Sequence, residues 1–279
     1  MNEYDPEQVN IRPAATVMLV DDRPDLQVFM MERHVNTVFA GGMWVFPGGA
    51  VDQDDDTRYM QAMSVHRSDR EASALMGLDS GGLAFYIAAV REAFEEAGIL
   101  LALNRDKLTR LDLSDTGSAL RFRKHRDDVN DRKRNFLDIL QQENLMVDAG
   151  AMHYVARWIT PVGPPKRFDA RFFVVRMPVN QIPVHDDREL VHSCWMPPGE
   201  ILEKAESKEM VLMTPTLRMV KNLAMFDSAE KVISAAAANL PEQRARVNTD
   251  TNTIVLPGEP GYDTGTVLQE NGWVRLRPH

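Results

Sequence analysis

The sequence predicts an α/β fold, and three observations support this prediction. Between residues 13 and 31, two β-rich runs flank a polar turn that contains a proline, which is typical of a hairpin. Residues 83–97 carry alanine and apolar residues at helical spacing and end at Gly98, which predicts a helix. Residues 154–160 and 167–175 alternate in polarity and predict two antiparallel strands. At 279 residues, the chain has the length of one decorated domain or of one domain with an appendage.

The composition is that of a globular protein that does not bind nucleic acid. Hydrophobic residues make up 44% of the chain and charged residues 26%. There are 32 Lys and Arg residues against 41 Asp and Glu residues, which gives a net charge of -9. Such a surface repels polyphosphates at long range. A phosphate-containing substrate would therefore need local arginines or a bound cation.

The cysteine content and the hydropathy pattern predict a cytoplasmic protein without a membrane partner. Cys194 is the only cysteine, so an intramolecular disulfide and a cysteine-based zinc site are excluded. The first ten residues are polar and acidic, and they lack the pattern of a signal peptide. No apolar run approaches the ~18 residues that a membrane-spanning helix needs.

Two later segments have helical character. Residues 118–144 predict one further helix, and its basic residues 121–126 indicate a solvated helix face balanced by acids. The alternative is an interaction protein that uses this helix to contact nucleic acid, and the net charge argues against it. The predicted core contacts of this helix are Leu120, Phe136, Leu137 and Leu140. Helical periodicity returns over 214–239.

The tail after about residue 240 predicts an appendage. It is loop-like, with two short β runs at 253–256 and 273–276. We expect it to lie as a hairpin on the main domain or on a partner subunit.

Three glutamates form the strongest candidate for a chemical site. Glu92, Glu95 and Glu96 have the spacing i, i+3 and i+4, so a helix would place their carboxylates on one face, where they repel one another. Mg²⁺ or Mn²⁺, which prefer oxygen ligands, would turn this repulsion into binding. The alternative is a solvent-exposed helix face without a metal.

The residues around these glutamates resemble the Nudix hydrolase signature. Residues 91–99, Arg-Glu-Ala-Phe-Glu-Glu-Ala-Gly-Ile, match its second half, which is R-E-hydrophobic-x-E-E-x-G-hydrophobic. Its first half is matched by Phe46-Pro47-Gly48-Gly49, with Asp55 in place of the usual glutamate. The family has seven residues between that acid and the arginine, whereas this chain has the 35 residues 56–90. We interpret the excess as an insertion, because extra loop residues add little closure entropy.

One subgroup is similar in more detail, the coenzyme A diphosphatase-like Nudix proteins of the nineteenth type, which carry such an insertion. Residues 33–52 match its Arg, its Gly-x-x-x-Phe-Pro-Gly-Gly and its following Asp, and they differ at His34 and Val38. Glu189 and Trp195 resemble the late acid and the strand tryptophan of many Nudix enzymes.

The resemblance implies a Nudix α/β/α sandwich with a mixed β-sheet. We expect the Nudix domain to cover residues 12–225, with a helical insertion at about 56–84 and a C-terminal extension at 226–279. A homodimer is an expectation at the family level.

The resemblance also implies hydrolysis of a pyrophosphate bond in a nucleoside diphosphate derivative. Coenzyme A or acyl-coenzyme A is the leading substrate. The alternatives are an ADP-ribose or dinucleotide pyrophosphatase and a non-catalytic module that senses a nucleotide.

The same resemblance assigns roles to individual residues. Glu92, Glu95, Glu96 and the carbonyl of Gly48 would hold Mg²⁺ or Mn²⁺, and Arg91 would orient Glu95. Glu189 and Glu92 are rival candidates for the general base. The candidates for substrate binding are Arg33, Phe46, Gly49 and Arg167. Arg33 and Arg167 could instead pair with neighbouring carboxylates.

Overall fold

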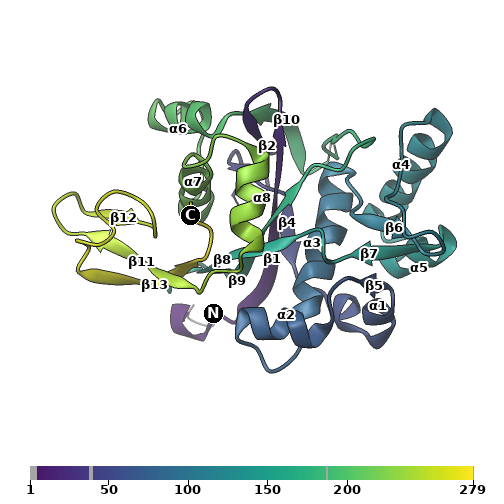
Figure 1. Ribbon diagram of the computed structural model, residues 1–279, viewed down its shortest axis with the longest axis horizontal. Helices are drawn as coiled ribbons and strands as arrows, with labels where there is room; N and C mark the ends of the chain where they lie inside the picture. Colours follow the sequence, from purple (N-terminus) through teal and green to yellow (C-terminus); the bar gives the residue numbers. More distant parts are fainter. Residues whose placement is uncertain (1–4, 38–39, 187, 279) are drawn as a thin grey trace.

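The computed structural model describes residues 5–37, 40–186 and 188–278. Across these residues, a mixed sheet of ten strands forms the centre of the molecule (Figure 1). Its strands are β1 (Ile11–Asp22), β2 (Leu26–Arg33), β3 (Trp44–Val45), β4 (Gly48–Ala50), β8 (His153–Ile159), β9 (Arg167–Arg176), β10 (Leu190–Met196), β11 (Gln243–Asn248), β12 (Thr253–Val255) and β13 (Val267–Val274). β1 and β9 are parallel, and the other pairs of this sheet are antiparallel. The predicted α/β fold with a mixed sheet is confirmed.

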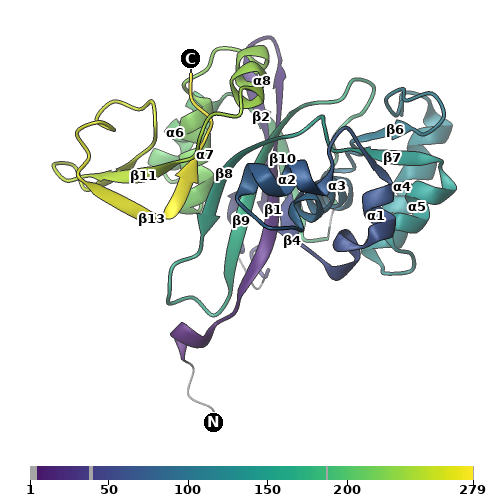
Figure 2. The same cartoon turned by 60° about the horizontal axis from the view of Figure 1, so that its bottom comes forward.

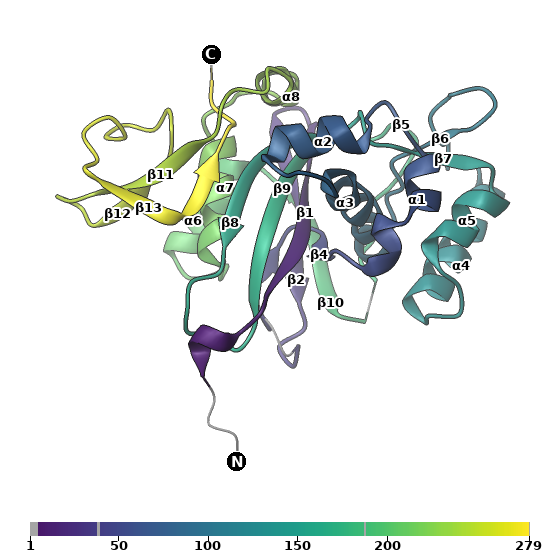
Figure 3. The ribbon, with the colours of Figure 1, turned by 90° about the horizontal axis from the view of Figure 1, so that it is seen from below.

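Helices cover both faces of this sheet. The helices are η1 (Pro6–Gln8), η2 (Gln53–Asp56), α1 (Arg58–Ala62), α2 (Asp69–Met76), α3 (Gly82–Ala97), α4 (Thr116–Asn130), α5 (Phe136–Gln142), α6 (Pro198–Glu206), α7 (Thr214–Leu223) and α8 (Ala229–Ala237). α2 and α3 lie on one side of β1 and β9, and α6, α7 and α8 lie on the other (Figures 2 and 3).

The two faces follow from the alternation of side chains along β1. Successive residues of a strand point to opposite faces of the sheet. Ala15, Val17 and Leu19 belong to the core on the α3 side, whereas Met18 and Val20 belong to the core on the α7 and α8 side. One strand therefore contributes to both hydrophobic cores.

The predicted hairpins are also present. β1 and β2 pair antiparallel, with Val20 opposite Val28 across the polar turn. β8 and β9 pair antiparallel, with Tyr154 opposite Phe173. The sheet order is β10-β2-β1-β9-β8-β13-β11-β12, with β3 beside β2 and β4 beside β1.

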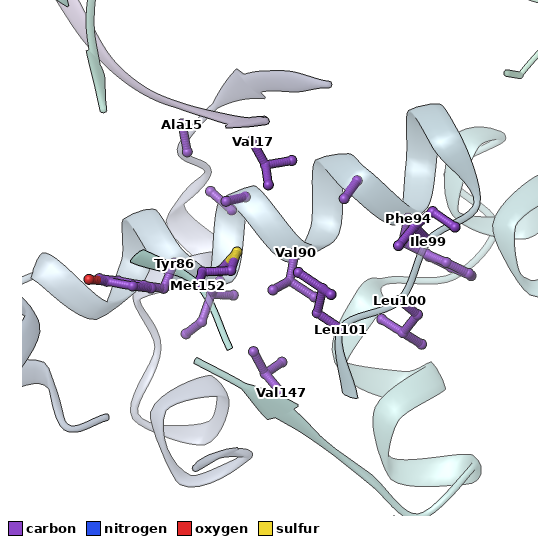
Figure 4. Packing of buried hydrophobic residues seen from close by; sticks show 14 of the residues in the cluster. Ala15, Val17, Tyr86, Val90, Phe94, Ile99, Leu100, Leu101, Val147 and Met152 are labelled. Atoms are coloured by element: carbon purple, nitrogen blue, oxygen red, sulfur yellow. The ribbon is translucent and has the colours of Figure 1, made fainter. Parts of the chain in front are cut away.

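α3 is buried along most of its length because it packs between two layers. Figure 4 shows Ala15 and Val17 on one side of the helix and Val147 on the other. Tyr86, Val90 and Phe94 lie in the same core, as side chains at helical spacing do on the buried part of a helix. The helix ends at Gly98, whose φ of 69° is the left-handed conformation that glycine adopts easily. The helix and its end are as predicted.

The segment between Asp55 and α3 forms α1, β5 (Ser64–Val65) and α2. β5 pairs with β7 (Leu145–Asp148), which also pairs with β6 (Ala102–Asn104) in a second, three-stranded sheet of the described residues. This segment therefore packs on its own small sheet and leaves the main sheet continuous. The boundaries 56–84 for the insertion stay a prediction, and α3 already begins at Gly82.

The prediction of one helix over 118–144 is wrong. The segment contains α4 and α5, which are separated at residues 131–135, where Arg132 has a φ of 56° and Asn135 caps α5 by accepting from Asp138 N. Leu120 is 61% exposed, so its predicted core role is also wrong, and Phe122 is buried instead. Phe136 and Leu140 are buried, and Leu137 packs against the core.

The C-terminal quarter differs from the predicted elements in two places. The periodic segment 214–239 forms two helices, α7 and α8, because Ser228 starts a new helix by accepting from Lys231 N. The tail contains β11, which the sequence pattern did not indicate, in addition to β12 and β13. β13 pairs with β8, so the tail continues the main sheet, and the domain division at residue 225 stays a prediction.

Candidate functional site

A buried ion pair joins the two separated halves of the motif. Arg91 Nε donates to Asp55 Oδ1 at 3.0 Å, and Arg91 Nη2 donates to Asp55 Oδ2 at 3.0 Å and to the Ala50 carbonyl at 2.9 Å. Asp55 is 2% exposed and Arg91 8%. Two parallel bonds between a guanidinium and a carboxylate define the orientation of both groups. The 35 intervening residues therefore leave this contact intact.

Arg91 also holds two of the three glutamates. Its Nη1 donates to Glu92 Oε1 at 2.7 Å and to Glu95 Oε1 at 3.2 Å. Burial alone would lower the pKa of Arg91, but the charges of Glu92, Asp55 and Glu95 raise it above its ordinary value. Arg91 is therefore cationic at the centre of a group of acids.

The turn after β3 brings its backbone against Glu96 and Glu92. β4 pairs with β1, and Gly48 N donates to Glu96 Oε2 at 2.8 Å. A Cβ on Gly48 would lie 2.5 Å from the Ala15 carbonyl oxygen, and one on Gly49 would lie 2.5 Å from Glu92 Oε1. Gly48 therefore requires glycine because backbone lies against it, whereas a side chain at Gly49 would displace the Glu92 carboxylate.

Burial controls the protonation of the glutamates. It raises the pKa of Glu92 to about 7 and that of Glu96 well above its ordinary value. It also raises the pKa of Glu95. The charge of Glu92 contributes to the shift of Glu96, and the charge of Glu95 contributes to that of Glu92, so the three carboxylates interact.

Arg33 links Glu189 to Glu96 of the glutamate cluster. Arg33 Nη2 lies 2.7 Å from Glu189 Oε2, and Arg33 Nη1 lies 3.6 Å from Glu96 Oε1. The backbone of His34 donates to the Glu189 carbonyl at 2.7 Å, where β10 pairs with β2. The Glu189 side chain is 61% exposed, in contrast to the buried Glu96.

The acids open into a cavity of about 930 Å³. Its lining includes Arg91, the three glutamates, Asp55 and Glu189. The volume lies within the range of small-molecule sites.

The cavity lining includes none of the four predicted substrate-binding residues: Arg33 and Gly49 adjoin Glu96 and Glu92, which line it, and the other two lie elsewhere. Phe46 is 3% exposed and packs in the core on the α7 and α8 side. Arg167 is level with Ile11 in the pairing of β9 with β1, and its Nε donates to the Thr160 carbonyl. Neither residue lines the described cavity, and their roles stay predictions. Val38, at which the motif differs, lies outside the described residues.

Sequence reasoning missed Arg126 of α4. Its guanidinium donates to the carbonyls of Glu95 at 2.8 Å, Glu96 at 2.6 Å and Val184 at 2.8 Å. Cations commonly bind the last carbonyls of a helix. Arg126 therefore caps the end of α3 that carries the glutamates, and no local signal links it to a helix 30 residues away.

The donor chemistry of the site fits a hard divalent cation. Three carboxylates that share a buried face interact unfavourably until a cation or a proton neutralises them. Within the described ranges, no three acidic, histidine or cysteine side chains converge at metal-ligand geometry. Arg91 and the Gly48 amide occupy one oxygen each of Glu92 and Glu96, so cation binding would require small shifts of these side chains.

Comparison with known proteins identifies the family. The family model described as the NUDT19 Nudix domain matches residues 60–223. The chain belongs to the Nudix hydrolase family. Nudix hydrolases generally use divalent metal ions. The match lies with the NUDT19-like subgroup, which confirms the resemblance noted in the sequence.

Three relatives of this Nudix chain have informative names. A human protein named acyl-coenzyme A diphosphatase NUDT19 is 30% identical over 283 residues, which cover 88% of this chain and 74% of the human protein. The Xenopus laevis protein of the same name is 25% identical, and the match covers 72% of this chain but only 60% of that protein. The crystal structure of a Nudix hydrolase from Alicyclobacillus acidocaldarius has a TM-score of 0.67 at 27% identity and covers 81% of this chain and 97% of its own.

In the described part of this Nudix chain, no helix is both long and apolar enough to cross a lipid bilayer.

Proposed function

We propose that this Nudix protein hydrolyses the pyrophosphate bond of coenzyme A or acyl-coenzyme A with the help of Mg²⁺ or Mn²⁺. The observation that carries the proposal is the Asp55–Arg91 pair, which closes the interrupted motif and holds Glu92 and Glu95 at the cavity. The names of the human and Xenopus relatives support the substrate.

Glu92, Glu95, Glu96 and the Gly48 carbonyl would hold the cation. A divalent cation there would neutralise phosphate charge and lower the pKa of a bound water. The protein's contribution is positioning: Arg91 fixes Glu92 and Glu95, and the Gly48 amide fixes Glu96. Burial of these groups excludes bulk water and strengthens their electrostatic effect on the phosphate.

Glu92 and Glu189 remain the two candidates for the general base. Glu92 lines the cavity, and burial raises its pKa to about 7 in the metal-free protein, whereas a bound cation would lower it. Glu189 is more exposed, lines the cavity and pairs with Arg33, which would orient its carboxylate. Comparison of the pH–rate profiles of Glu92→Gln and Glu189→Gln decides between them, because only loss of the base removes the acidic limb.

The decisive experiment is hydrolysis of a substrate panel with product identification. Purified protein is incubated with Mg²⁺ or Mn²⁺ and one of four substrates: coenzyme A, acetyl-coenzyme A, ADP-ribose or NADH. The products are separated by chromatography and identified by mass spectrometry. We expect phosphopantetheine, or its acylated form, together with adenosine 3′,5′-bisphosphate.

Other results would favour the alternatives. Cleavage of ADP-ribose or NADH in preference to coenzyme A would indicate an ADP-ribose or dinucleotide pyrophosphatase. Nucleotide binding without turnover under either metal would indicate a sensor module. The cytoplasmic location and the homodimer stay predictions from the sequence.

A further inference from the structure

A basic cluster lines the cavity beside the acids. Its members are Arg132, Lys133 and Arg134, which join α4 to α5, and Arg188, which precedes β10. Asn130 Nδ2 donates to the Glu95 carbonyl at 3.1 Å, so the start of this segment is attached to the end of α3. The basic cluster and the three glutamates therefore share one cavity.

Asp131 pairs with two members of the cluster, and the charges of Asp127, Asp128 and Asp186 also act on Lys133 or Arg188. Asp131 Oδ2 lies 2.8 Å from Lys133 Nζ, and Asp131 Oδ1 lies 2.6 Å from Arg188 Nη1, so one carboxylate serves two cations. Arg134 Nη1 lies 3.4 Å from His125 Nδ1. Among the residues described, the side chain of Arg132 has no hydrogen-bond or ion-pair partner.

The cavity lining carries basic residues in addition to its acids. The net charge of the whole chain is -9, so the gathering of four cations at one cavity wall is local and not a consequence of composition. Cations that are close together repel one another unless an anion lies between them. The planar fork of arginine matches the geometry of a phosphate group. The acidic residues suit a cation, and the basic residues suit a second anion.

We propose that Arg132, Lys133 and Arg188 bind a phosphomonoester that the substrate carries apart from its pyrophosphate. The inference rests on the proposed function, because it assigns a binding partner to that same cavity. Coenzyme A carries such a group as the 3′-phosphate of its ribose, whereas ADP-ribose and NADH carry none. The basic cluster would therefore select coenzyme A derivatives over these other nucleotides.

The test compares two probes that differ only in this phosphate. Isothermal titration calorimetry measures the affinity of the full chain for adenosine 3′,5′-bisphosphate and for adenosine 5′-monophosphate. The variant is Arg132→Asn with Lys133→Gln, because asparagine tolerates the left-handed φ of 56° at position 132. The matched control is Arg123→Gln with Lys124→Gln, which removes two positive charges from exposed positions of α4 that do not line the cavity.

We expect wild-type protein and the control to bind the bisphosphate at least about tenfold more tightly, the size of one charge-assisted phosphate contact. In the Arg132/Lys133 variant this ratio should fall toward one. The same ratio in all three proteins, or no preference in the wild type, would overturn the inference.

A kinetic comparison separates this inference from the proposed function. The ratio of kcat/KM for coenzyme A to that for dephospho-coenzyme A should fall in the Arg132/Lys133 variant but not in the control. If coenzyme A is cleaved and the ratio is the same in all three proteins, the inference fails while the proposed function stands. If the bisphosphate preference depends on the cluster but nothing is cleaved, the inference stands while the proposed function fails.

Discussion

Removal of the Glu92 charge should stabilise the metal-free protein at neutral and alkaline pH. Burial raises the pKa of this carboxyl from its ordinary value of 4.5 to about 7. The difference corresponds to about 3 kcal/mol of free energy of unfolding. The variant Glu92→Gln keeps the shape and one acceptor oxygen for Arg91 Nη1 but does not ionise.

The sign of the pH dependence follows from which state binds the proton. Below pH 4.5, Glu92 is protonated in both the folded and the unfolded protein, and its contribution to the free energy of unfolding is fully present. Between pH 4.5 and 7, the folded protein holds the proton and the unfolded chain releases it, so stability is lost as the pH rises through the folded pKa. The advantage of Glu92→Gln over the wild type should therefore be near zero at pH 4.5 and reach about 3 kcal/mol at pH 8.

Urea unfolding in the presence of EDTA at several pH values measures this difference. Glu203→Gln, an exposed position on α6, is the control and should show no such pH dependence. Equal stability of Glu92→Gln and the wild type at pH 8, or an advantage that is independent of pH, would show that burial does not raise the pKa of Glu92 in this way.

Three further substitutions test the contacts that position the glutamates. Asp55→Asn leaves the buried Arg91 guanidinium without its charged partner, so the free energy of unfolding measured in urea should fall by about 3 kcal/mol. An unchanged unfolding midpoint would contradict this prediction. Gly49→Ala places a Cβ against Glu92 Oε1 and should displace this carboxylate. We expect kcat to fall about a hundredfold, whereas the free energy of unfolding should change by less than about 1 kcal/mol. Full activity of this variant would show that Glu92 need not stay in place. Arg126→Gln removes charged hydrogen-bond donors from the end of α3 and should lower the free energy of unfolding by about 2 kcal/mol. We also expect kcat to fall. A normal kcat would limit Arg126 to a structural role.

The sequence predicts those elements whose signals are local. The helix at 82–97 carries apolar residues at helical spacing and a terminal glycine, and both features concern neighbouring residues. The hairpin at 11–33 has two β-rich runs around a polar turn, and the strands at 153–176 alternate in polarity around a proline-rich turn. The family resemblance places Asp55 and Arg91 in one motif, but their pairing was not predicted, because the residues between them carry no signal that brings them together.

The features that sequence reasoning missed depend on tertiary contacts. α4 was assigned the wrong buried residue, Leu120, although Phe122, Arg126 and Val129 are spaced by four and three residues and lie on its buried face. Arg126 looked like a solvated cation because its partners lie on α3. The break after α4 contains neither proline nor glycine, so the sequence does not mark it clearly. In the structure it consists of a residue with positive φ, Arg132, and a helix cap, Asn135.

The contact between Arg33 and Glu189 shows the same limitation. The sequence suggested a separate role for each residue, and the antiparallel pairing of β10 with β2 brings Leu190 opposite Arg33 and so places the two charges together. Strand neighbours that are more than 150 residues apart cannot be paired from local pattern alone.

We expect the interrupted motif to form a working diphosphatase site. The most direct test is the rate of coenzyme A cleavage with Mg²⁺ or Mn²⁺ by the wild type and by Glu95→Gln, assayed side by side with EDTA controls. We expect metal-dependent cleavage by the wild type and loss of nearly all activity in Glu95→Gln, because the carboxylate held by Arg91 would no longer be there to bind the cation. Absence of cleavage of any tested diphosphate by the wild type under both metals, or full activity of Glu95→Gln, would contradict this expectation.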